Sequence, residues 1–368
     1  MYAVVTGGGT SGHVMPAVAI IELLIEAGHS PNEIGYVGAR RGIETRLMRD
    51  SAVVTEFLPM SGLQRSLSWR NLALNLVLPV RLLRSRVLAR ALIRKWKPRV
   101  VVSVGGYASE PMSAAARAAG VPLVCVSYDR IPGLATRRQA RHATACAVAF
   151  SETDLPHAIV TGAPVRSEIR HLDVSHRRDA ARRTLGVPID ATVVTVMGGS
   201  LGSGVLNASV PGILQQCADV GNVAVFHICG ERFVTDTIAG DVPRGIAAYV
   251  RTGYESRIAD VYAATDLLVA RAGASTIAEI ATVGVASILV PWVGAADDHQ
   301  RLNAEWLSRD SAAELVTEDS CASGDLAVLV RQLVTDSSRR HALATAAREK
   351  GERHRGSSLL TVIANAAR

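Results

Sequence analysis

The sequence predicts an α/β protein made of two Rossmann-like domains, each built on a parallel sheet. Apolar strand-like runs alternate with amphipathic helical stretches along the whole chain, which is typical of parallel strands joined by helices. The runs fall into two similar sets, and each set has a glycine-rich turn near its first strand. The length of 368 residues exceeds one ordinary core and fits two domains.

The first strand runs directly into a glycine-rich turn that suits the binding of an anion. Strand Ala3–Thr6 is followed by Gly7-Gly-Gly-Thr-Ser-Gly-His13 and then by a periodic apolar stretch from Val14 to Ile25. Unpaired N–H groups at a helix N-terminus stabilise an anion, and glycine lets the backbone approach a phosphate. His13 at the end of the turn is a candidate general base. The other strands expected in this half are Glu33–Val37, Val53–Leu58, Val100–Val104, Val121–Val126 and Ala147–Phe150.

A turn of this kind also has less specific interpretations. It is not a Walker loop, because no Gly-Lys-Ser/Thr sequence follows, and in α/β folds such a turn often only shapes a tight corner. It is a poor dinucleotide-binding fingerprint, because its glycines are followed by His13 and Pro16 and no acidic residue clearly closes a following strand. The role of this glycine-rich turn therefore has to be inferred from the other motifs of the chain.

The second half repeats the arrangement around the turn Gly198-Gly-Ser-Leu-Gly202, which precedes a helix containing Leu206 and Ile213. The strands expected here are Thr192–Met197, Val223–Ile228, Ala248–Arg251, Leu267–Ala270, Ala286–Val290 and Ala313–Val316. The breaker-rich stretch Gly162-Ala-Pro-Val-Arg166 separates the two sets. We therefore expect domains at residues 1–163 and 164–340, and a C-terminal helix at 341–368 that packs back on the first domain. Ligands of such sheets bind beyond the carboxyl ends of the strands.

Two polar stretches of the second half have the chemistry of a ligand site. Arg271-Ala-Gly-Ala-Ser-Thr276 follows a strand and opens a helix, so it offers an anion site with capping hydroxyls. Glu279, one turn further on, can accept hydrogen bonds from vicinal sugar hydroxyls, although the helix dipole alone also favours an acid there. A polar cluster after the next strand contains Asp298, His299, Gln300 and Asn303. The acidic pair at 297–298 lacks further carboxylates, so we expect neither a metal nor a cofactor.

The composition narrows the class of protein. Hydrophobic residues make up 48% and aromatic residues only 4%, as in cores of buried parallel strands. The five cysteines show no Cys-x-x-Cys spacing, so zinc and a disulfide framework are both unexpected and a reducing cytoplasm fits. The N-terminus lacks the basic leader of a signal peptide, and no apolar run approaches the roughly 20 residues of a membrane span.

A basic segment, residues 57–109, contains no Asp or Glu. Its apolar side chains, among them Trp69, are interleaved with Arg65, Arg70, Arg81, Arg84, Arg86, Arg90, Arg94, Lys95, Lys97 and Arg99. Such a segment suits peripheral binding to an anionic membrane, and it equally fits a helix that faces the core and solvates its arginines. Nucleic acid is not expected, because no motif for it is present and few aromatic residues could stack on bases.

Six motifs occur in an order that resembles one enzyme family. They are Gly8-Gly-Thr-Ser-Gly-His13, Gly105-Gly-Tyr107, Gly162-Ala-Pro-Val-Arg166, Gly198-Gly-Ser-Leu-Gly202, Arg271-Ala-Gly-Ala-Ser-Thr276 with Glu279, and Asp298-His-Gln300 with Asn303. Over nearly its whole length the chain is similar to the MurG-type glycosyltransferases of glycosyltransferase family 28. The resemblance implies a GT-B fold, in which two Rossmann-like domains with parallel sheets face each other across a cleft. It also implies an inverting, metal-independent enzyme that moves N-acetylglucosamine from UDP-N-acetylglucosamine to a polyprenyl-linked acceptor, most simply lipid I in peptidoglycan synthesis. Such an enzyme would be peripheral, on the cytoplasmic face of the cell membrane.

The resemblance further implies a role for individual residues. His13 would be the catalytic base. The acceptor would be bound by Gly9, Thr10, Ser11, Gly12, Tyr107 and Asp129. The UDP-sugar would be bound by Arg166, Gly199, Ser200, Leu201, Gly202, Tyr254, Ala274, Ser275, Thr276, Glu279, His299, Gln300 and Asn303.

One run departs from the family pattern. Aligned on Gly133-Leu134, the chain has Val126-Ser127-Tyr128-Asp129 where the family usually has His-Glu-Gln-Asn or a similar sequence. Because this run belongs to the acceptor side, the acceptor could instead be a prenyl phosphoglycolipid, as in moenomycin-type antibiotic biosynthesis. Two further alternatives are a UDP-N-acetylglucosamine 2-epimerase and a non-catalytic UDP-sugar-binding paralogue on the membrane.

Overall fold

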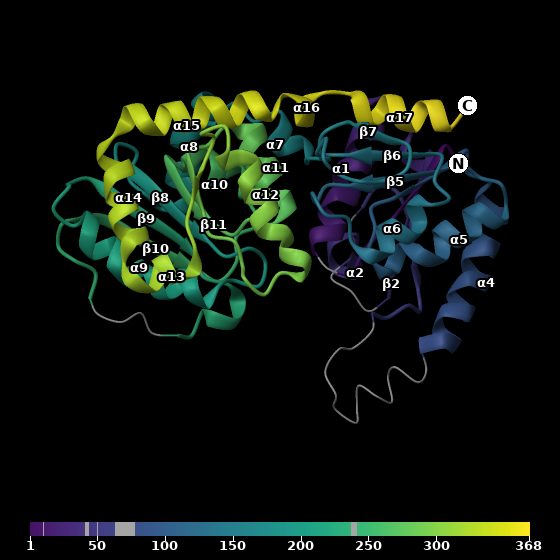
Figure 1. Ribbon diagram of the computed structural model, residues 1–368, viewed down its shortest axis with the longest axis horizontal. Helices are drawn as coiled ribbons and strands as arrows, with labels where there is room; N and C mark the ends of the chain where they lie inside the picture. The colour runs from purple at the N-terminus through teal and green to yellow at the C-terminus, as the bar shows by residue number, and fades with distance from the viewer. Residues whose placement is uncertain (10, 41–43, 50, 63–77, 237–240) are drawn as a thin grey trace. The chain divides into compact units, whose positions relative to one another are not determined.

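The computed structural model describes residues 1–9, 11–40, 44–49, 51–62, 78–236 and 241–368. The chain divides into two compact units (Figure 1). Unit 1 comprises Met1–Ser167 and Gly356–Arg368, and unit 2 comprises Glu168–Arg355. Unit 2 thus continues beyond residue 340, the expected end of the second domain, and only the last residues of the chain join unit 1.

Unit 1 is built on a seven-stranded sheet in the order β3-β2-β1-β4-β5-β6-β7, with every neighbouring pair parallel. The strands are β1 (Ala3–Thr6), β2 (Ile34–Ala39), β3 (Val54–Leu58), β4 (Val100–Ser103), β5 (Leu123–Ser127), β6 (Ala145–Val148) and β7 (Ala158–Val160). The six strands predicted for this half are all present, with ends shifted by up to two residues. Strand β7 was not predicted, because it has three residues and is largely exposed at the sheet edge, so it carries no buried apolar run.

Unit 2 is built on a six-stranded parallel sheet in the order β10-β9-β8-β11-β12-β13. Its strands are β8 (Thr192–Met197), β9 (Val223–Ile228), β10 (Ile246–Thr252), β11 (Leu267–Ala270), β12 (Ser287–Leu289) and β13 (Glu314–Leu315). All six correspond to predicted strands. Both sheets have the strand order of doubly wound folds, in which the chain reverses its direction of growth after the third strand.

Helices connect most of the successive parallel strands. In unit 1 they are α1 (Ser11–Glu26), α2 (Glu44–Leu47), α4 (Leu78–Trp96), α5 (Glu110–Ala118), α6 (Leu134–Ala140) and α17 (Ser358–Ala366). Helix α7 (Ser167–Arg170) begins at the last residue of unit 1 before the chain enters unit 2. The helices of unit 2 are α8 (Val174–Leu185), α9 (Gly204–Cys217), α10 (Ile258–Ala264), α11 (Ala274–Val283), α12 (His299–Ser308), α13 (Glu318–Ser323), α14 (Asp325–Thr335), α15 (Ser337–Lys350) and α16 (Glu352–Arg355). Short 3-10 turns lie at Pro31–Glu33, Tyr107–Ser109, Glu231–Phe233 and Ala296–Asp298.

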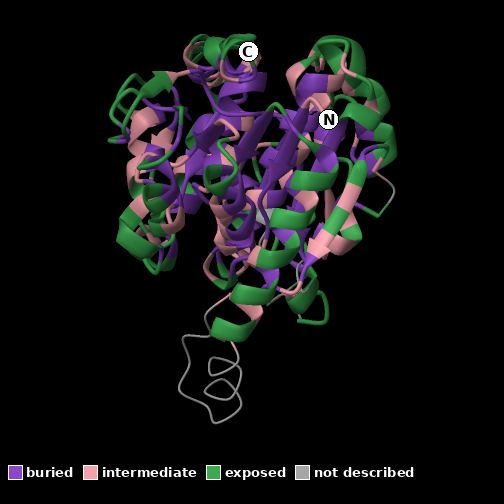
Figure 2. Cartoon of the chain, turned by 90° about the vertical axis from the view of Figure 1, so that its right-hand side faces the viewer, coloured by how far each residue is buried: buried purple, intermediate pink, exposed green. Residues whose placement is uncertain are grey.

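The core of each unit consists mainly of small aliphatic side chains on the strands and on the inner faces of the helices. Figure 2 shows most of the strands buried while the outer faces of the helices are exposed. Helix α17 packs against β4, β5 and β6, so the C-terminus is part of unit 1 (Figure 1). None of the described helices combines the length and the hydropathy that a membrane span requires.

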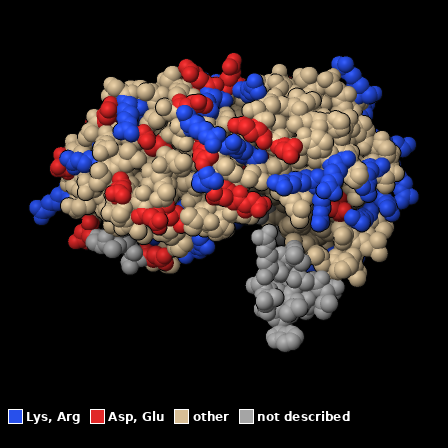
Figure 3. All heavy atoms as spheres, in the orientation of Figure 1, with Lys and Arg blue, Asp and Glu red and all other residues tan. Residues whose placement is uncertain are grey.

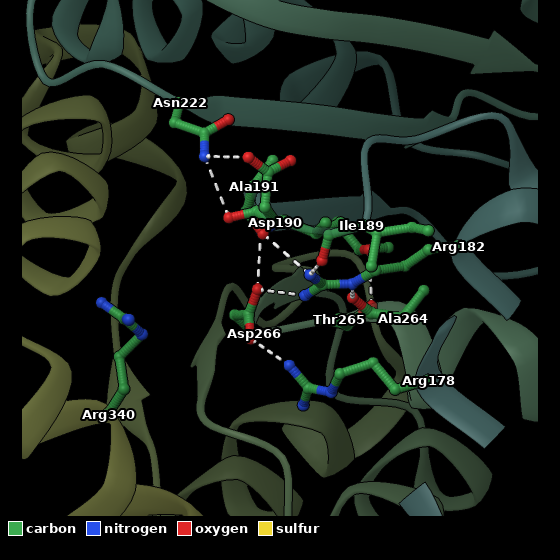
Figure 4. Close-up of polar contacts among 12 residues, drawn as sticks. Arg178, Arg182, Ile189, Asp190, Ala191, Asn222, Ala264, Thr265, Asp266 and Arg340 are labelled. Carbon is green, nitrogen blue, oxygen red and sulfur yellow. Dashed lines mark hydrogen bonds and ion pairs between the residues drawn. The ribbon is translucent and has the colours of Figure 1, made fainter. Parts of the chain in front are cut away.

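A buried ionic network fixes α8 to the sheet of unit 2, at the end opposite the carboxyl ends of the strands (Figure 4). Arg182 donates through Nη2 to Asp266 Oδ2 at 2.7 Å and through Nη1 to the carbonyl of Ala191 at 3.0 Å. Asp266 also accepts from the backbone N–H of Val193 at 2.7 Å and pairs with Arg178. Because every charge is paired and hydrogen-bonded, the network is a structural feature rather than a ligand site.

Candidate active site

In unit 1, the predicted acceptor-side residues lie in loops that follow β1, β4 and β5. His13 is in the first turn of α1, Tyr107 is in the loop after β4, and Asp129 is in the loop after β5. These strands are neighbours in the sheet, so their loops meet at one edge, where doubly wound folds bind ligands. Thr10 and the side chain of Ser11 lie outside the described part of the chain.

A glycine after β4, Gly106, makes room for the imidazole of His13. A Cβ on Gly106 would lie 2.8 Å from His13 Cδ2 and 2.7 Å from the Gly8 carbonyl oxygen. Both Gly105 and Gly106 have positive φ angles, 84° and 76°. A side chain at Gly106 would therefore strain the backbone and displace the histidine ring.

The hydroxyl of Tyr128 links the side chain of His13 to the backbone of the glycine-rich turn. Nδ1 of His13 lies 2.5 Å from the hydroxyl oxygen of Tyr128. The same hydroxyl donates to the Gly12 carbonyl at 2.6 Å. Tyr128 is only 5% exposed, and the two rings meet edge to face with centroids 6.1 Å apart. The half-buried imidazole therefore has a defined orientation.

Burial lowers the pKa of His13 below its ordinary value. The negative charges of Asp129 and Glu44 and the carbonyl of Val104 act in the opposite direction but do not cancel the effect of burial. The imidazole is accordingly neutral near pH 7 and can accept a proton, and Asp129 is close enough to stabilise the imidazolium that would form.

A buried carboxylate holds the glycine-rich turn. Glu44 is fully buried. Its Oε1 accepts from the backbone N–H of Gly9 at 3.1 Å and from the N–H of Ala39 at 2.9 Å. A Cβ on Gly8 would collide with this carboxylate. The Gly9 N–H, which we expected to bind the acceptor, thus donates to an internal anion in this structure.

Tyr107 covers the same turn from the other side. A Cβ on Gly9 would collide with its ring, and a Cβ on Gly62 would lie 3.0 Å from Tyr107 Cε1. Burial, together with the charge of Glu44, raises the pKa of the phenol, so Tyr107 stays protonated and available as a donor.

In unit 2, the turn after β8 projects three exposed residues at the start of α9. Gly199, Ser200 and Leu201 are exposed, while Gly202 is buried with a φ of 70° against the carbonyl of Cys229. Ser203 caps α9 by accepting from the N–H of Leu206 at 3.3 Å. A helix of fourteen residues therefore presents its N-terminus next to an exposed backbone turn, an arrangement that binds phosphate groups.

Arg271 ties three strand ends of unit 2 together. Its Nε donates to Ser203 Oγ at 3.1 Å, and its Nη1 donates to the Val290 carbonyl at 3.0 Å. It also pairs with Glu318. Because Arg271 is buried and its Nε and Nη1 are bonded within unit 2, it supports the turn.

Glu279 is oriented by a buried tyrosine. The Tyr262 hydroxyl, from α10, donates to Glu279 Oε2 at 3.0 Å, and Glu279 lies on the following α11. Ser275 Oγ is buried without a hydrogen-bond partner among the described residues, and Ala274 and Thr276 flank it in the first turn of the same helix. The helix start thus combines an unpaired hydroxyl with a fixed carboxylate.

The remaining donor-side residues differ in their surroundings. Tyr254 is exposed just after β10. The His299 Nδ1 donates to the Ala296 carbonyl at 2.7 Å, and Gln300 Oε1 accepts from the Trp292 N–H at 3.0 Å. Asn303 is fully buried and donates to the Ala272 carbonyl at 3.4 Å, so it supports the loop after β11.

Arg166 belongs to unit 1, whereas the other predicted donor-side residues belong to unit 2. No metal centre emerges: among the residues that the structure describes, no three His, Cys, Asp or Glu side chains are grouped as metal ligands.

Sequence reasoning missed Glu44 and Tyr262, and it treated Tyr128 only as part of a divergent run. An isolated acid after the second strand and a tyrosine inside an apolar helix carry no local signal, since their roles come from partners 35 and 17 residues away. Only the position of Tyr128, directly after a buried strand, was a usable hint.

Helix α4 carries an unusual surface. Its buried face consists of Ser85, Ala89, Ile93 and Trp96. Residues at 100° intervals place Val80, Leu83 and Val87 on the opposite face, and these side chains are 67%, 65% and 53% exposed. Lys and Arg side chains gather around the region of α4, α5 and α6 in Figure 3. The predicted basic segment therefore has both a core face and an exposed apolar stripe; its residues 63–77 lie outside the described part of the chain.

The sequence profile of the glycosyltransferase family 28 N-terminal domain matches residues 3–148, and that of the C-terminal domain matches residues 193–358. A UDP-N-acetylglucosamine–N-acetylmuramyl-(pentapeptide) pyrophosphoryl-undecaprenol N-acetylglucosamine transferase from Desulforudis audaxviator is 34% identical over 99% of this chain and 98% of its own length. The transferase of the same name from Xanthomonas campestris is 36% identical over 94% of this chain and 77% of its own length.

Solved structures show the same fold. Acinetobacter baumannii MurG superposes with a TM-score of 0.74 at 24% identity, covering 99% of this chain and 98% of its own. Phytolacca americana UGT2, solved with UDP-2-fluoro-glucose and pterostilbene, gives a TM-score of 0.67 at 15% identity, covering 100% and 99% of the two chains. The predicted GT-B fold class, with two Rossmann-like parallel-sheet domains, is confirmed. The two profiles and the full-length relatives together show that this chain is a glycosyltransferase and belongs to glycosyltransferase family 28.

Proposed function

We propose that the protein transfers N-acetylglucosamine from UDP-N-acetylglucosamine to lipid I, the undecaprenyl pyrophosphate that carries N-acetylmuramyl-pentapeptide, with inversion at the anomeric carbon. The observation that carries this proposal is the 34% identity to a transferase of that activity over 99% of the chain. Relatives of this kind do not favour the 2-epimerase or the non-catalytic paralogue.

Unit 2 is proposed to bind the donor. The exposed turn at Gly199–Leu201 and the N-terminus of α9 suit the diphosphate, and Glu279, held by Tyr262, suits the ribose hydroxyls. Tyr254 is exposed where a uracil could stack. His299 and Gln300 would read the sugar hydroxyls through groups not used in their backbone contacts.

Unit 1 is proposed to bind the acceptor. The turn that ends at His13, together with Tyr107 and Asp129, would receive the pyrophosphate and the sugar of the lipid. With the Gly9 N–H engaged by Glu44, the pyrophosphate contacts would fall to the other N–H groups at the start of α1. His13 supplies the base.

The proposed reaction is a single displacement. His13 takes the proton of the acceptor hydroxyl as its oxygen forms a bond to the anomeric carbon from the face opposite UDP. The bond from that carbon to the diphosphate oxygen breaks, and UDP leaves with the electron pair. The helix dipole and backbone donors of the α9 turn stabilise the charge that develops on the diphosphate, which is the role a metal has in other transferases.

The test is product formation from UDP-N-acetylglucosamine and a short-chain lipid I analogue in the presence of EDTA, with UDP release followed in parallel. We expect transfer and UDP release in equal amounts. UDP-sugar binding without transfer would overturn the assignment of lipid I while keeping the donor half. Loss of turnover in EDTA that added Mg²⁺ restores would overturn metal independence.

The contacts of the loop after β5 are a reason to test a second acceptor in the same assay. Tyr128 takes part in the hydrogen bonding of His13, so the divergent run changes the acceptor side of the site and not only its surface. A prenyl phosphoglycolipid of the moenomycin type is therefore the alternative acceptor. A specificity constant higher for that lipid than for lipid I would assign the protein to antibiotic biosynthesis.

We further propose that α4 holds the enzyme on an anionic membrane at its cytoplasmic face, where UDP-sugars are made. The stripe Val80, Leu83 and Val87 would enter the lipid interface, and the flanking arginines Arg84, Arg90 and Arg94 would pair with lipid phosphates. Arg86 contributes less, because it already pairs with Glu110.

A further inference from the structure

We propose that Tyr128 is a positioning residue that keeps His13 in the tautomer with its proton on Nδ1, so that Nε2 is the atom that accepts the proton of the acceptor hydroxyl. The inference rests on the proposed role of His13 as the base, and it concerns a residue at which this chain departs from the family pattern.

Counting donors and acceptors gives the tautomer. A phenol has one proton to donate, and a carbonyl oxygen can only accept. The Gly12 carbonyl, 2.6 Å from the Tyr128 hydroxyl oxygen, therefore takes the phenolic proton. The hydroxyl oxygen then has only lone pairs to offer to His13 Nδ1 at 2.5 Å. A hydrogen bond at this distance requires the proton to be on Nδ1, so a neutral ring, which has only one such proton, keeps a lone pair on Nε2. The Val104 carbonyl can only accept a hydrogen bond, so it favours the protonated ring and raises the pKa of His13.

The consequence is catalytic because a neutral imidazole is a base only at its unprotonated nitrogen. In the opposite tautomer the basic nitrogen would be Nδ1, which faces the buried phenol. A free histidine side chain prefers the proton on Nε2, so the active tautomer needs a partner to hold it. The carboxylate of a serine-protease triad fixes its histidine in the same way.

The phenol of Tyr128 can hold the tautomer of His13 without placing a charge next to the base, because it is neutral. The groups that act on the His13 ring are the Tyr128 hydroxyl, the Asp129 and Glu44 carboxylates, and the Val104 carbonyl. Burial raises the pKa of Tyr128 well above its usual range, so the phenol keeps its proton throughout the working pH range. Orientation and charge stabilisation are thus divided between Tyr128 and Asp129.

The direct test is the ¹⁵N spectrum of histidine ring nitrogens in the full-length protein, with His13 assigned by its disappearance in His13→Gln. We expect a protonated Nδ1 and an unprotonated Nε2 at pH 8. His299, whose Nδ1 donates to the Ala296 carbonyl, provides a reference for this pattern in the same spectrum. In Tyr128→Phe the His13 signals should shift to the tautomer with its proton on Nε2. A wild-type ring protonated on Nε2 would overturn the inference.

The kinetic test compares Tyr128→Phe with Tyr36→Phe. Tyr36, on β2, donates to the Gly7 carbonyl at 2.7 Å, so this control removes a buried hydroxyl that bonds to the same turn but not to the histidine. We expect Tyr128→Phe to lose about 10²-fold in kcat, since general-base catalysis is worth roughly 10²–10⁴-fold, with the KM for the UDP-sugar within about three-fold. Tyr36→Phe should keep most of its kcat. Equal losses in both variants, or none in Tyr128→Phe, would reduce Tyr128 to a packing role.

The two tests also separate this inference from the proposed function. If His13→Ala kept full turnover, the base assignment would fail whatever the tautomer. If the wild-type ring carried its proton on Nε2 while His13→Ala lost turnover, the base assignment would stand and only the role of Tyr128 would fail.

Discussion

Single hydroxyl groups orient the two side chains on which the proposed chemistry depends. Tyr128 bonds to His13 in unit 1, and Tyr262 bonds to Glu279 in unit 2. Both tyrosines are buried, so their hydroxyls have little freedom and transmit a fixed geometry to a less buried neighbour. At the residue scale, each proposed binding site depends on one of these pairs. A substitution in one pair should therefore affect only the substrate that binds to the same unit.

Replacing His13 with alanine should lower turnover by about 10²–10⁴-fold, because the base is lost. The affinity for UDP should stay within a few-fold, since the donor-binding residues of unit 2 are unchanged. Steady-state rates and titration calorimetry with UDP would measure the two effects. An equal loss of both would remove His13 from the acceptor side.

Replacing Glu279 with alanine should weaken UDP-sugar binding by about 1.5–3 kcal/mol, the range for hydrogen bonds to a charged group. Glu305, on the neighbouring α12, pairs with Arg301 and Arg309 and offers a matched control, since Glu305→Ala removes a carboxylate outside the proposed contacts. Unchanged nucleotide affinity in Glu279→Ala would contradict the ribose assignment.

At the scale of elements, the geometry of strand ends explains where the sites form. Each glycine turn follows the strand at which the sheet order reverses, β1 in unit 1 and β8 in unit 2. The loops on either side of that point diverge, which leaves space for a ligand above the sheet. Helix α4 shows the other element-level feature, two opposite apolar faces of which only one meets the core.

The exposed face of α4 gives a prediction about membrane binding. Changing Arg84, Arg90 and Arg94 to glutamate should reduce sedimentation with vesicles containing anionic lipid by more than ten-fold, since each basic residue near such a surface is worth about 1 kcal/mol. The same charge change at Arg183, Arg244 and Arg353, exposed residues of unit 2, is the control. Similar vesicle binding by both variants would indicate that the arginines of α4 only solvate the helix.

At the scale of the whole molecule, stability rests on two separate cores and on polar groups that are buried in a neutral state. His227 bonds to Asn207 and Tyr249 inside unit 2, and His354 is buried near the end of the same unit. Burial, and to a lesser degree the nearby Arg251 and Arg355, lowers the pKa of each histidine to about 4.

Acidification should therefore destabilise unit 2. Between pH 6.5 and about 4 the unfolded chain binds protons that the folded histidines do not, so the free energy of unfolding falls as the pH falls through this window. The loss is on the order of 3 kcal/mol for each histidine. Urea unfolding at pH 7, 5.5 and 4.5 would measure it, and His227→Gln should remove about half of the slope. A midpoint independent of pH over this range would contradict the prediction.

Sequence patterns alone predicted the two parallel-sheet domains, twelve strands that the structure contains, the glycine turns and the family. These features depend on local information, because hydrophobic periodicity, glycine and helix-start residues act within a few positions of one another. The short edge strand β7 was missed for the same reason, since it is too exposed to leave a local pattern.

The contacts between side chains of the site, in contrast, depend on tertiary packing. His13 meets Tyr128 across 115 residues and Gly9 meets Glu44 across 35, so neither contact is encoded in any local pattern. Likewise, burial against distant elements makes Asn303 a support of its loop, and the side of α4 that packs on the core leaves Val80, Leu83 and Val87 exposed on the other side. Local sequence patterns identify the candidate residues. Their protonation, orientation and partners depend on how strands and helices that are remote in the sequence pack together.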